Sequence, residues 1–485
     1  MLPRGGVQYS NVLGRPDIRE TPPMSSTPVA FDSALVSRFD RNGPRYTSYP
    51  TADRFVEAFG PEQYRSWAGR RNIGGIYRPL AIYVHLPFCR DVCFYCACNK
   101  IVTRDAGKTA RYLEYLGKEI ELQAQLFRDD LRVAQMHWGG GTPTYYDTAT
   151  LRALHARIAG SFQLAADGDY SIEVDPRTVD APAVHALREM GFNRVSFGVQ
   201  DFEPAVQVAV HRLQSAERTL EVIEAARAAG FGSTNIDLIY GLPKQTLMTF
   251  NRTLAQVLAT RPHRIALYNY AHLPQLFKAQ RRISDGDLPS PDMRLKLLGL
   301  AVKRLTDAGY VHIGMDHFAL PDDSLAVAQR QGRLRRDFQG YSAGGEADLV
   351  GLGVSAIGAV GPTYSQNHRT LPAYYDCLDR GQLPIMRGIE LSADDLLRRQ
   401  VIQSLMCHFA LSKESVEIAY LIDFDRYFAA ELEDLREFEA LGLVTDEDGW
   451  LTVTPRGRFV IRSIGMVFDR YLRHDREVRR YSRVI

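Results

Sequence analysis

Four of the six cysteines in this chain of 485 residues lie within ten consecutive positions. They are Cys89, Cys93, Cys96 and Cys98, and they directly follow an apolar run over residues 80–85. Thiolates bind iron well, so three cysteines spaced C-x3-C-x2-C can hold three irons of a cubane iron–sulfur cluster. A loop that carries such a cluster must gather its sulfurs around one point, and this constrains the surrounding fold.

Three cysteine ligands leave the fourth iron of the cubane without a protein ligand. An open metal position is typical of sites that perform chemistry, whereas structural metal sites are closed. In this spacing the open iron is the expected seat for the amino and carboxylate groups of S-adenosylmethionine, which supplies the radical chemistry while the protein supplies position. Cys98 is not needed as a ligand, so it is either a spectator or acts on the substrate or in cluster assembly.

Two other uses of the cysteines fit the sequence less well. A structural zinc site needs a second pair of ligands at short spacing, and the remaining cysteines, Cys377 and Cys407, are far apart in the sequence. Disulfides need an oxidising compartment, and residues 1–30 lack the apolar core of a signal peptide.

The composition indicates a globular protein of two domains. With 45% hydrophobic residues the chain can bury one large core and one smaller core. No run approaches the roughly 18 apolar residues that a membrane span needs. The balance of 59 Lys and Arg against 57 Asp and Glu gives no reason to expect nucleic acid as a partner. We expect a cytoplasmic monomer and interpret the basic stretch at residues 470–483 as a solvated helical face.

Short β-prone runs alternate with segments of helical periodicity. The runs cover residues 81–85, 135–138, 170–174, 194–200, 234–239 and 264–268. This order predicts an α/β fold of parallel strands joined by crossover helices, which close fully or partly into a barrel. Ligands bind at the C-terminal ends of the strands in such folds, and the cysteine loop follows the first strand.

Glycines and polar side chains follow the other predicted strands. A run of three glycines at residues 139–141 lets the backbone approach a ligand closely, and Thr142 adds a hydroxyl. Glu173, Gln200 and Asp237 lie at the ends of the next three strands, where they can bind ribose hydroxyls, an amine and a carboxylate.

The whole chain divides into four predicted regions. Residues 1–30 are rich in Pro, Gly and Ser and are predicted to be a mobile tail. Residues 31–79 form an arm that is extended over residues 42–51, and residues 80–365 form the barrel domain with adjoining strands. Residues 366–485 form a smaller, mainly helical domain with helices over 393–409, 412–422 and 425–441 before a small hairpin near 449–453.

Four motifs together resemble those of the oxygen-independent coproporphyrinogen III oxidases, a family of radical S-adenosylmethionine enzymes. The motifs are YVHLPFC at 83–89, CFYCACNK at 93–100, HWGGGTP at 137–143 and NIDLIYGLP at 235–243. The resemblance extends over residues 31–485, including PRYTSYP at 44–50 and YSRVI at 481–485. It implies a partial (β/α)6 barrel with extra N-terminal and C-terminal elements, one [4Fe-4S] cluster and two S-adenosylmethionine molecules.

The resemblance also implies an activity and a set of site residues. The family converts two propionate side chains of coproporphyrinogen III to vinyl groups with loss of carbon dioxide, giving protoporphyrinogen IX in haem synthesis. An oxidoreductase with an unidentified electron donor and acceptor is therefore expected. By motif, the cluster ligands are Cys89, Cys93 and Cys96; the first S-adenosylmethionine is matched by Tyr83, Gly140, Glu173 and Ile357; the second is matched by Tyr95, Gly141, Thr142, Gln200, Arg212, Asp237 and Ala271.

The catalytic residues are not defined by the sequence, and the candidates are Tyr83, His85 and Cys98. Arg45 is a candidate for binding a substrate carboxylate, because a guanidinium grips a carboxylate in a fork. A structural pair between Arg45 and an acidic neighbour is the alternative. A related branch of the superfamily serves as a haem chaperone, but its His-Asn-x-x-Tyr-Trp motif is replaced here by SQNH at residues 365–368.

Overall fold

The structure is a computed structural model that describes residues 29, 31–72 and 77–474. Its central element is a twelve-stranded sheet with the order β16-β15-β14-β13-β1-β4-β5-β6-β7-β8-β10-β9. Apart from Val29, the tail predicted at residues 1–30 lies outside the described residues. So do the end of the basic stretch beyond His474 and the motif at residues 481–485.

The middle of the sheet consists of the six predicted strands. Each strand pairs in parallel with the next along the chain, as the alternating pattern predicts. The strands are β1 Leu80–Leu86, β4 Arg132–Gly140, β5 Gln163–Val174, β6 Arg194–Gln200, β7 Ser233–Tyr240 and β8 Arg264–Asn269. Parallel pairing brings the carboxyl ends of all six strands to one edge of the sheet.

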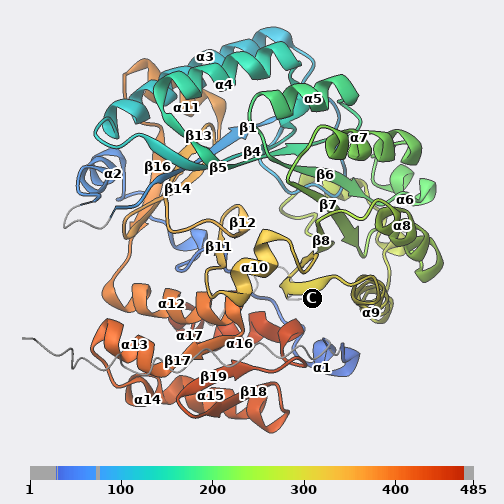
Figure 1. The fold of residues 1–485 in the computed structure, drawn as a ribbon, viewed down its shortest axis with the longest axis vertical. Coiled ribbons are helices and arrows are strands. Elements are labelled where there is room, and N and C mark those ends of the chain that lie inside the picture. The colour runs from blue at the N-terminus through green and yellow to red at the C-terminus, as the bar shows by residue number, and fades with distance from the viewer. Residues whose placement is uncertain (1–28, 30, 73–76, 475–485) are drawn as a thin grey trace, which may run out of the picture.

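Helices follow these strands and cover the outer face of the curved sheet (Figure 1). They are α3 Ala106–Leu126, α4 Thr148–Ser161, α5 Ala181–Glu189, α6 Pro204–Ala209, α7 Ala216–Ala228, α8 Leu247–Ala259 and α9 Pro291–Asp307. In α3 the side chain of Asp105 caps the first turn by accepting from the backbone of Gly107, and Leu116 and Ile120 are fully buried on the inner face. The predicted β/α alternation is confirmed.

Additional strands extend both edges of the sheet. β13 Asp348–Leu352 pairs in parallel with β1, whereas β14 Ile357–Val360, β15 Thr363–Asn367 and β16 Ile385–Glu390 continue antiparallel. β10 His317–Ala319 and β9 Val311–Gly314 form the opposite edge. Among the described residues the sheet ends at β16 and β9, so the barrel is partial. The predicted domain boundary at residue 365 lies within β15, and the division into domains stays a prediction.

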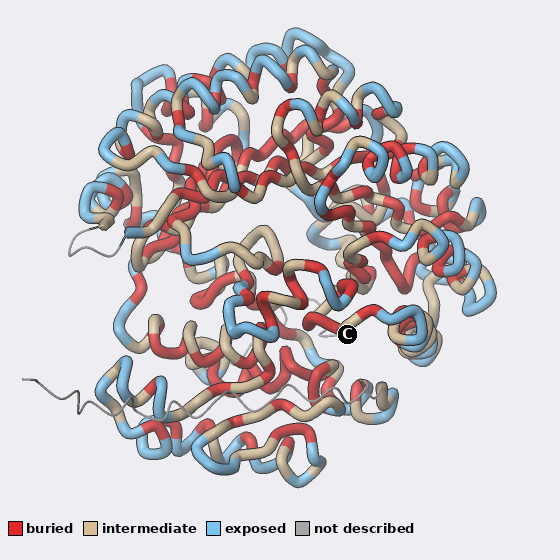
Figure 2. Tube along the Cα trace, viewed as in Figure 1, coloured by how far each residue is buried: buried red, intermediate tan, exposed pale blue. Residues whose placement is uncertain are grey.

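The concave side of the sheet faces a small hairpin and a separate helical unit (Figure 1). The hairpin consists of β11 Arg335–Asp337 and β12 Gly340–Ser342, close to α10 Ser324–Arg330, and α11 Leu371–Asp379 packs on α3. Figure 2 shows buried residues along the sheet and inside the helical unit, with exposed residues on the outer helix faces.

The C-terminal unit is mainly helical, as predicted, and also contains a three-stranded sheet. Its helices are α12 Ala393–His408, α13 Lys413–Tyr420, α14 Phe424–Tyr427, α15 Ala429–Ala440, α16 Ile461–Val467 and α17 Arg470–His474. Its strands are β17 Ala410–Ser412, β18 Val444–Glu447 and β19 Trp450–Val453. The helix predicted at residues 425–441 is two helices, which meet at Phe428, a residue with non-helical dihedral angles and a completely buried ring.

The N-terminal arm packs on both parts of the molecule. α1 Ser33–Arg38 and the two tyrosines of the extended segment, Tyr46 and Tyr49, belong to the core of the C-terminal unit. The hydroxyl of Tyr46 donates to Asp469 at 3.0 Å. α2 Pro61–Ala68 packs on β14 and β15 at the other end of the arm. None of the helices in the described part of the chain is long and apolar enough to cross a membrane.

Candidate active site

A cavity of about 1170 Å³ lies at the carboxyl ends of the parallel strands. All four cysteines of the loop after β1 line it. Eight of the eleven predicted cofactor residues also line it, namely Tyr95, Gly140, Gly141, Thr142, Glu173, Gln200, Arg212 and Asp237. The other three, Tyr83, Ala271 and Ile357, are not among its lining residues.

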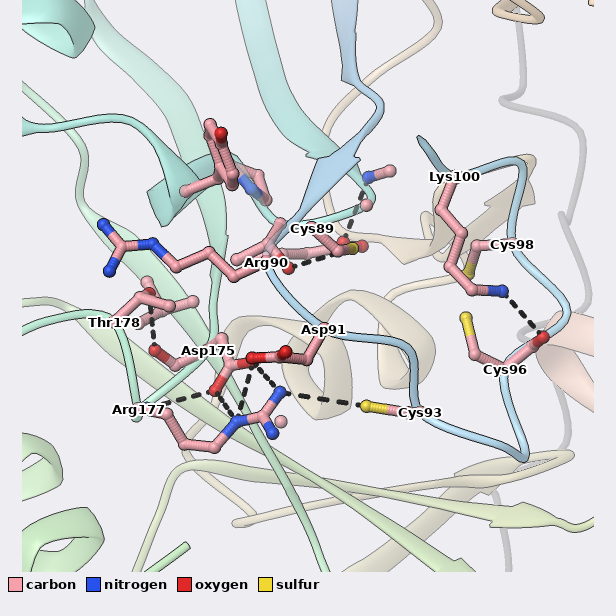
Figure 3. A pocket seen from close by; sticks show the side chains of 18 of the residues that line it. Cys89, Arg90, Asp91, Cys93, Cys96, Cys98, Lys100, Asp175, Arg177 and Thr178 are labelled. Atoms are coloured by element: carbon pink, nitrogen blue, oxygen red, sulfur yellow. Dashed lines mark hydrogen bonds and ion pairs between the residues drawn. The ribbon is translucent and has the colours of Figure 1, made fainter. Parts of the chain in front are cut away.

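The cysteine loop is fixed at both of its ends. β2 Phe88–Cys89 pairs with β3 Ile101–Val102, and this pairing joins the two ends of the loop. Inside it, the ammonium group of Lys100 donates to the carbonyl oxygen of Cys96 at 3.0 Å (Figure 3). A hydrogen bond with Cys98, with Lys100 nearby, lowers the pKa of Cys96 to about 6, which favours the thiolate that a metal needs.

The arrangement of the cysteines around one cavity is compatible with a cluster. Among the described residues, no three His, Cys, Asp or Glu side chains converge closely enough to hold one metal ion. In a cubane each thiolate binds a different iron, so its ligands surround the cluster without meeting at one point. Three thiols on one loop that all border a large cavity satisfy this requirement.

The glycine run brings the end of β4 against the cysteine loop. Gly140 has a φ of +116°, and a side chain there would meet the ring of His85 at 2.8 Å. A Cβ on Gly141 would lie 2.5 Å from the carbonyl oxygen of Pro87. The absent side chains let the backbone amide of Gly141 donate to the carbonyl of Leu86 at 2.9 Å. Only glycine permits this close approach.

Glu173 stands at the end of β5 with two donors beside it. The backbone amide of Gly140 donates to its carboxylate at 3.3 Å, and Nε2 of His137 lies 3.3 Å from the other oxygen. The ring of Tyr83 stacks on His137 with 5.9 Å between ring centroids. Tyr83 is therefore linked to the cavity-lining Glu173 indirectly, through His137.

His85, a catalytic candidate, is buried between Tyr83 and the end of the cysteine loop. Its Nδ1 lies 3.0 Å from the hydroxyl of Tyr83, and its Nε2 lies 3.0 Å from the carbonyl oxygen of Asn99. Burial lowers the pKa of His85, so the neutral ring is favoured. Both ring nitrogens are engaged, which fixes the ring between β1 and the cysteine loop. Cys98, the remaining candidate, is exposed and lines the cavity.

An ionic cluster that the sequence analysis did not assign lies beside Cys93. Asp175 accepts from Arg177 at 2.6 Å and from Arg212 at 3.2 Å (Figure 3 shows the first pair). Burial alone would raise the pKa of Asp175, but the two guanidinium groups lower it to about 2. Arg177 was missed because only its position three residues after the end of β5 marks it in the sequence.

Asp237 and Tyr95 also line the cavity. Burial raises the pKa of Asp237 to about 7, although Ser196 and Asn235 both donate to it, at 3.1 and 2.8 Å. The side-chain amide of Gln280 donates to the carbonyl oxygens of Tyr95 and Ala271 at 3.0 and 3.1 Å. Ala271 is thus joined to the cavity-lining Tyr95.

Two predicted residues lie further from the cysteines. Ile357 begins β14 and is partly buried. Arg45 donates to Asp316 at 3.0 Å, so the structural pair considered in the sequence analysis has an observed partner. Its guanidinium also lies 5.8 Å from the ring of Tyr268, which lines the cavity.

Comparison with protein families identifies two regions of the chain. The profile of the Radical SAM superfamily matches residues 83–257, which include the cysteine loop and most of the parallel strands. The profile of the HemN C-terminal domain matches residues 391–460, which begin just before α12.

Characterised relatives match over nearly the whole chain. The oxygen-independent coproporphyrinogen III oxidase of Pseudomonas aeruginosa is 49% identical over 94% of this chain and 99% of its own length. The enzymes of the same name from Escherichia coli and from Synechocystis are 47% and 44% identical and cover 95% and 94% of this chain, and 100% and 98% of their own lengths.

The fold is similar to a solved structure as well. The coproporphyrinogen III oxidase HemN from Escherichia coli, described as a radical SAM enzyme, superposes with a TM-score of 0.87 at 46% sequence identity. The match covers 92% of this chain and 100% of the solved chain.

Proposed function

Because the chain belongs to the oxygen-independent coproporphyrinogen III oxidases of the radical S-adenosylmethionine superfamily, we infer that it converts two propionate side chains of coproporphyrinogen III to vinyl groups. The product is protoporphyrinogen IX, and the protein is an S-adenosylmethionine-dependent oxidoreductase of haem synthesis. The observation that carries this inference is the position of the cysteine loop and eight predicted cofactor residues around one cavity.

Cys89, Cys93 and Cys96 would hold the [4Fe-4S] cluster that membership of the superfamily implies. When bound, the cluster and S-adenosylmethionine together supply the radical that removes a hydrogen atom from a substrate propionate. The chain contributes a cysteine loop whose ends are joined by the pairing of β2 and β3, a lowered pKa at Cys96, and a hydrogen bond between the backbones of Gly141 and Leu86. The strand pairing and the backbone contact hold the cysteine loop in place, and the lowered pKa favours the thiolate form of Cys96.

The first S-adenosylmethionine is proposed to lie against Tyr83, Gly140, Glu173 and Ile357. Glu173 supports this role because its carboxylate is oriented by the amide of Gly140 and by His137 and still lines the cavity. A carboxylate in this position can accept hydrogen bonds from both ribose hydroxyls. Tyr83 acts as the support of His137 through the stacked rings.

A second S-adenosylmethionine is proposed on the other side of the cavity. Its residues are Tyr95, Gly141, Thr142, Gln200, Arg212, Asp237 and Ala271. The volume of about 1170 Å³ is compatible with two such molecules, since ligand pockets for single drug-sized molecules are roughly 300–1,000 Å³. Gln280 supports the site by joining the loops of Tyr95 and Ala271.

We propose that the carboxylates of the substrate face the part of the cavity that Tyr268 lines. Arg45 reaches the same tyrosine ring and is shared with Asp316, so a substrate carboxylate would compete with Asp316 for the guanidinium. The monomeric state, the cytoplasmic location and the external electron donor and acceptor stay predictions.

A haem chaperone of the same superfamily is the second candidate. Relatives of 44–49% identity that cover almost the whole chain have oxidase names, which supports the enzyme over the chaperone. The Cys98-Asn99-Lys100 segment after the third proposed cluster ligand also supports the oxidase, and its Cys98 and Lys100 line the cavity.

The test is turnover by the full-length protein reconstituted with iron and sulfide without oxygen. Incubation with coproporphyrinogen III, S-adenosylmethionine and a reductant is expected to yield protoporphyrinogen IX, detected by mass spectrometry as the loss of two carbon dioxide molecules and four hydrogen atoms. Parallel titration with haem separates the two candidates. Stoichiometric haem binding without vinyl product would overturn the oxidase and favour the chaperone.

A further inference from the structure

The sulfur atom of Cys93 lies within reach of two guanidinium groups. Nη1 of Arg212 is 3.6 Å from it, and Nη2 of Arg177 is 3.8 Å from it. Figure 3 shows the Arg177 side chain extended from beside Asp175 toward the thiol. Arg212 already has a predicted role toward S-adenosylmethionine, whereas Arg177 has none.

Asp175 holds both cations in this position. It accepts from Nε and Nη2 of Arg177 at 3.0 and 2.6 Å, and from Nη1 of Arg212 at 3.2 Å. The Asp175 side chain is 7% exposed, and those of Arg212 and Arg177 are 8% and 25% exposed. Such poorly solvated groups are weakly screened, so their charges act strongly on a neighbouring sulfur.

The charges in this group do not balance. Two guanidinium groups share one carboxylate, which leaves one positive charge beside the thiol of Cys93. Arg212 is committed further, because its Nη2 donates to the carbonyl oxygen of Gly198 at 2.5 Å. Arg177 lines the cavity and turns the same amino group toward both Asp175 and Cys93.

We propose that Arg177 is a positioning residue that donates a hydrogen bond to the Cys93 thiolate and raises the reduction potential of the cluster that this thiolate holds. The proposal rests on the function inferred above, in which Cys93 is a cluster ligand. Reduction adds one negative charge to the cluster. Hydrogen bonds to the sulfurs and nearby positive charge stabilise the reduced form, so they shift its potential upward.

The experiment is a redox titration of the reconstituted full-length protein, followed by electron paramagnetic resonance of the reduced cluster. Arg177→Met is expected to lower the midpoint potential at unchanged iron and sulfide content. Arg177→Lys keeps the charge without the fork of donors and is expected to lie between Arg177→Met and the native protein. Arg104→Met is the matched control, because Arg104 lines the same cavity but is 78% exposed and pairs with Asp91.

Equal midpoint potentials in the native protein and both Arg177 variants would overturn the proposal. A second measurement, on the native protein and Arg177→Lys, tests the proposal even when Arg177→Met does not bind the cluster. Native protein grown with 15N-arginine is expected to show a 15N coupling to the reduced cluster in pulsed electron paramagnetic resonance, and Arg177→Lys is expected to weaken it. A native spectrum without the coupling, or one that Arg177→Lys leaves unchanged, also overturns the proposal. Native protein that binds no cluster would contradict the proposed function itself.

Discussion

Two buried ionic clusters in this molecule use the same residue types differently. In the cavity cluster of Asp175, Arg177 and Arg212, two guanidinium groups share one carboxylate. In the C-terminal cluster every guanidinium has two carboxylate partners: Arg398 pairs with Asp394 and Glu431, Arg470 with Asp394 and Asp395, and Arg473 with Glu431 and Asp434.

The difference follows from what each cluster faces. The C-terminal cluster joins α12, α15 and α17, and its three guanidinium groups share four carboxylates, so each cation there is neutralised, which lowers the cost of burial. The cavity cluster faces a space that is proposed to hold anionic thiolates and carboxylates, so unbalanced positive charge is retained there. Surplus positive charge beside a cavity therefore favours the binding of anions, whereas cations that are all neutralised by carboxylates serve to join helices.

Replacement of Cys93 by alanine tests the cavity side with the largest expected effect. Without this thiol the cluster loses one of its three proposed protein ligands. We expect loss of the cluster absorbance and of turnover to background, measured after anaerobic reconstitution, while the C-terminal cluster keeps its contribution to folding. Full activity of Cys93→Ala would contradict the proposed role of Cys93 as a cluster ligand, and with it the binding role assigned to the cavity cluster.

Replacement of Glu431 by glutamine tests the C-terminal cluster. The change leaves Arg398 with one buried carboxylate fewer, because Glu431 accepts from it at 3.0 Å and is 6% exposed. Breaking a buried pair costs about 3–5 kcal/mol, so the free energy of unfolding in a denaturant titration should fall by about that amount. Iron content per folded protein should not change.

The control for this variant is Asp434→Asn. Asp434 is 57% exposed where it pairs with Arg473, so its loss should cost less than about 1 kcal/mol. Similar losses in both variants would show that burial does not separate the two kinds of pair.

Replacement of Glu173 by glutamine separates binding from folding on the cavity side. A hydrogen bond to a charged group contributes about 1.5–3 kcal/mol, so the Kd for S-adenosylmethionine should rise roughly 10- to 100-fold in equilibrium dialysis. Glu189→Gln is the matched control, because Glu189 pairs with Arg152 at an exposed position outside the cavity. Unchanged affinity in Glu173→Gln would contradict the proposed first site.

Glu119 is a third kind of buried carboxylate, and its effect per pH unit is the smallest of those considered. It accepts hydrogen bonds from Gly353, Asn367 and Tyr374 but has no cation partner among these contacts, and burial raises its pKa from 4.5 to about 7. The folded protein therefore keeps a proton that the unfolded chain releases. Its contribution to stability is largest below about pH 4.5 and declines as pH rises toward 7.

Glu119→Gln should remove this decline, which is at most about 1.4 kcal/mol per pH unit. The measurement is the difference in unfolding free energy between the native protein and the variant from pH 4.5 to 7. Parallel pH profiles for the two proteins would show that Glu119 does not titrate in this window.

The sequence predicts the parallel half of the fold well, because β1, β4, β5, β6, β7 and β8 each contain a local apolar run and helical segments separate these runs. It does not predict the antiparallel edges. β14 and β15 are only four and five residues long, and their pairing depends on partners that the local pattern does not specify. The local pattern also does not show that Phe428 packs on Phe468, which lies 40 positions away in the sequence.

The candidate site shows the same division. The cysteines, Gly141 and Glu173 follow directly from motifs at strand ends and all line the cavity. The pair of Arg45 with Asp316 joins residues 271 positions apart, so no local pattern could distinguish it from a free cation. The cavity cluster was missed for a similar reason: Arg212 comes from the segment after β6 and meets Asp175 only in the folded chain.

The bridge made by Gln280 bears on how tightly the cavity can bind. One buried amide, 1% exposed, ties the carbonyl oxygens of Tyr95 and Ala271 together across 185 and 9 positions of sequence. The conformational entropy of these two loops is therefore lost when the chain folds. A ligand that touches both loops meets a preorganised surface, and more of its contact energy appears as affinity.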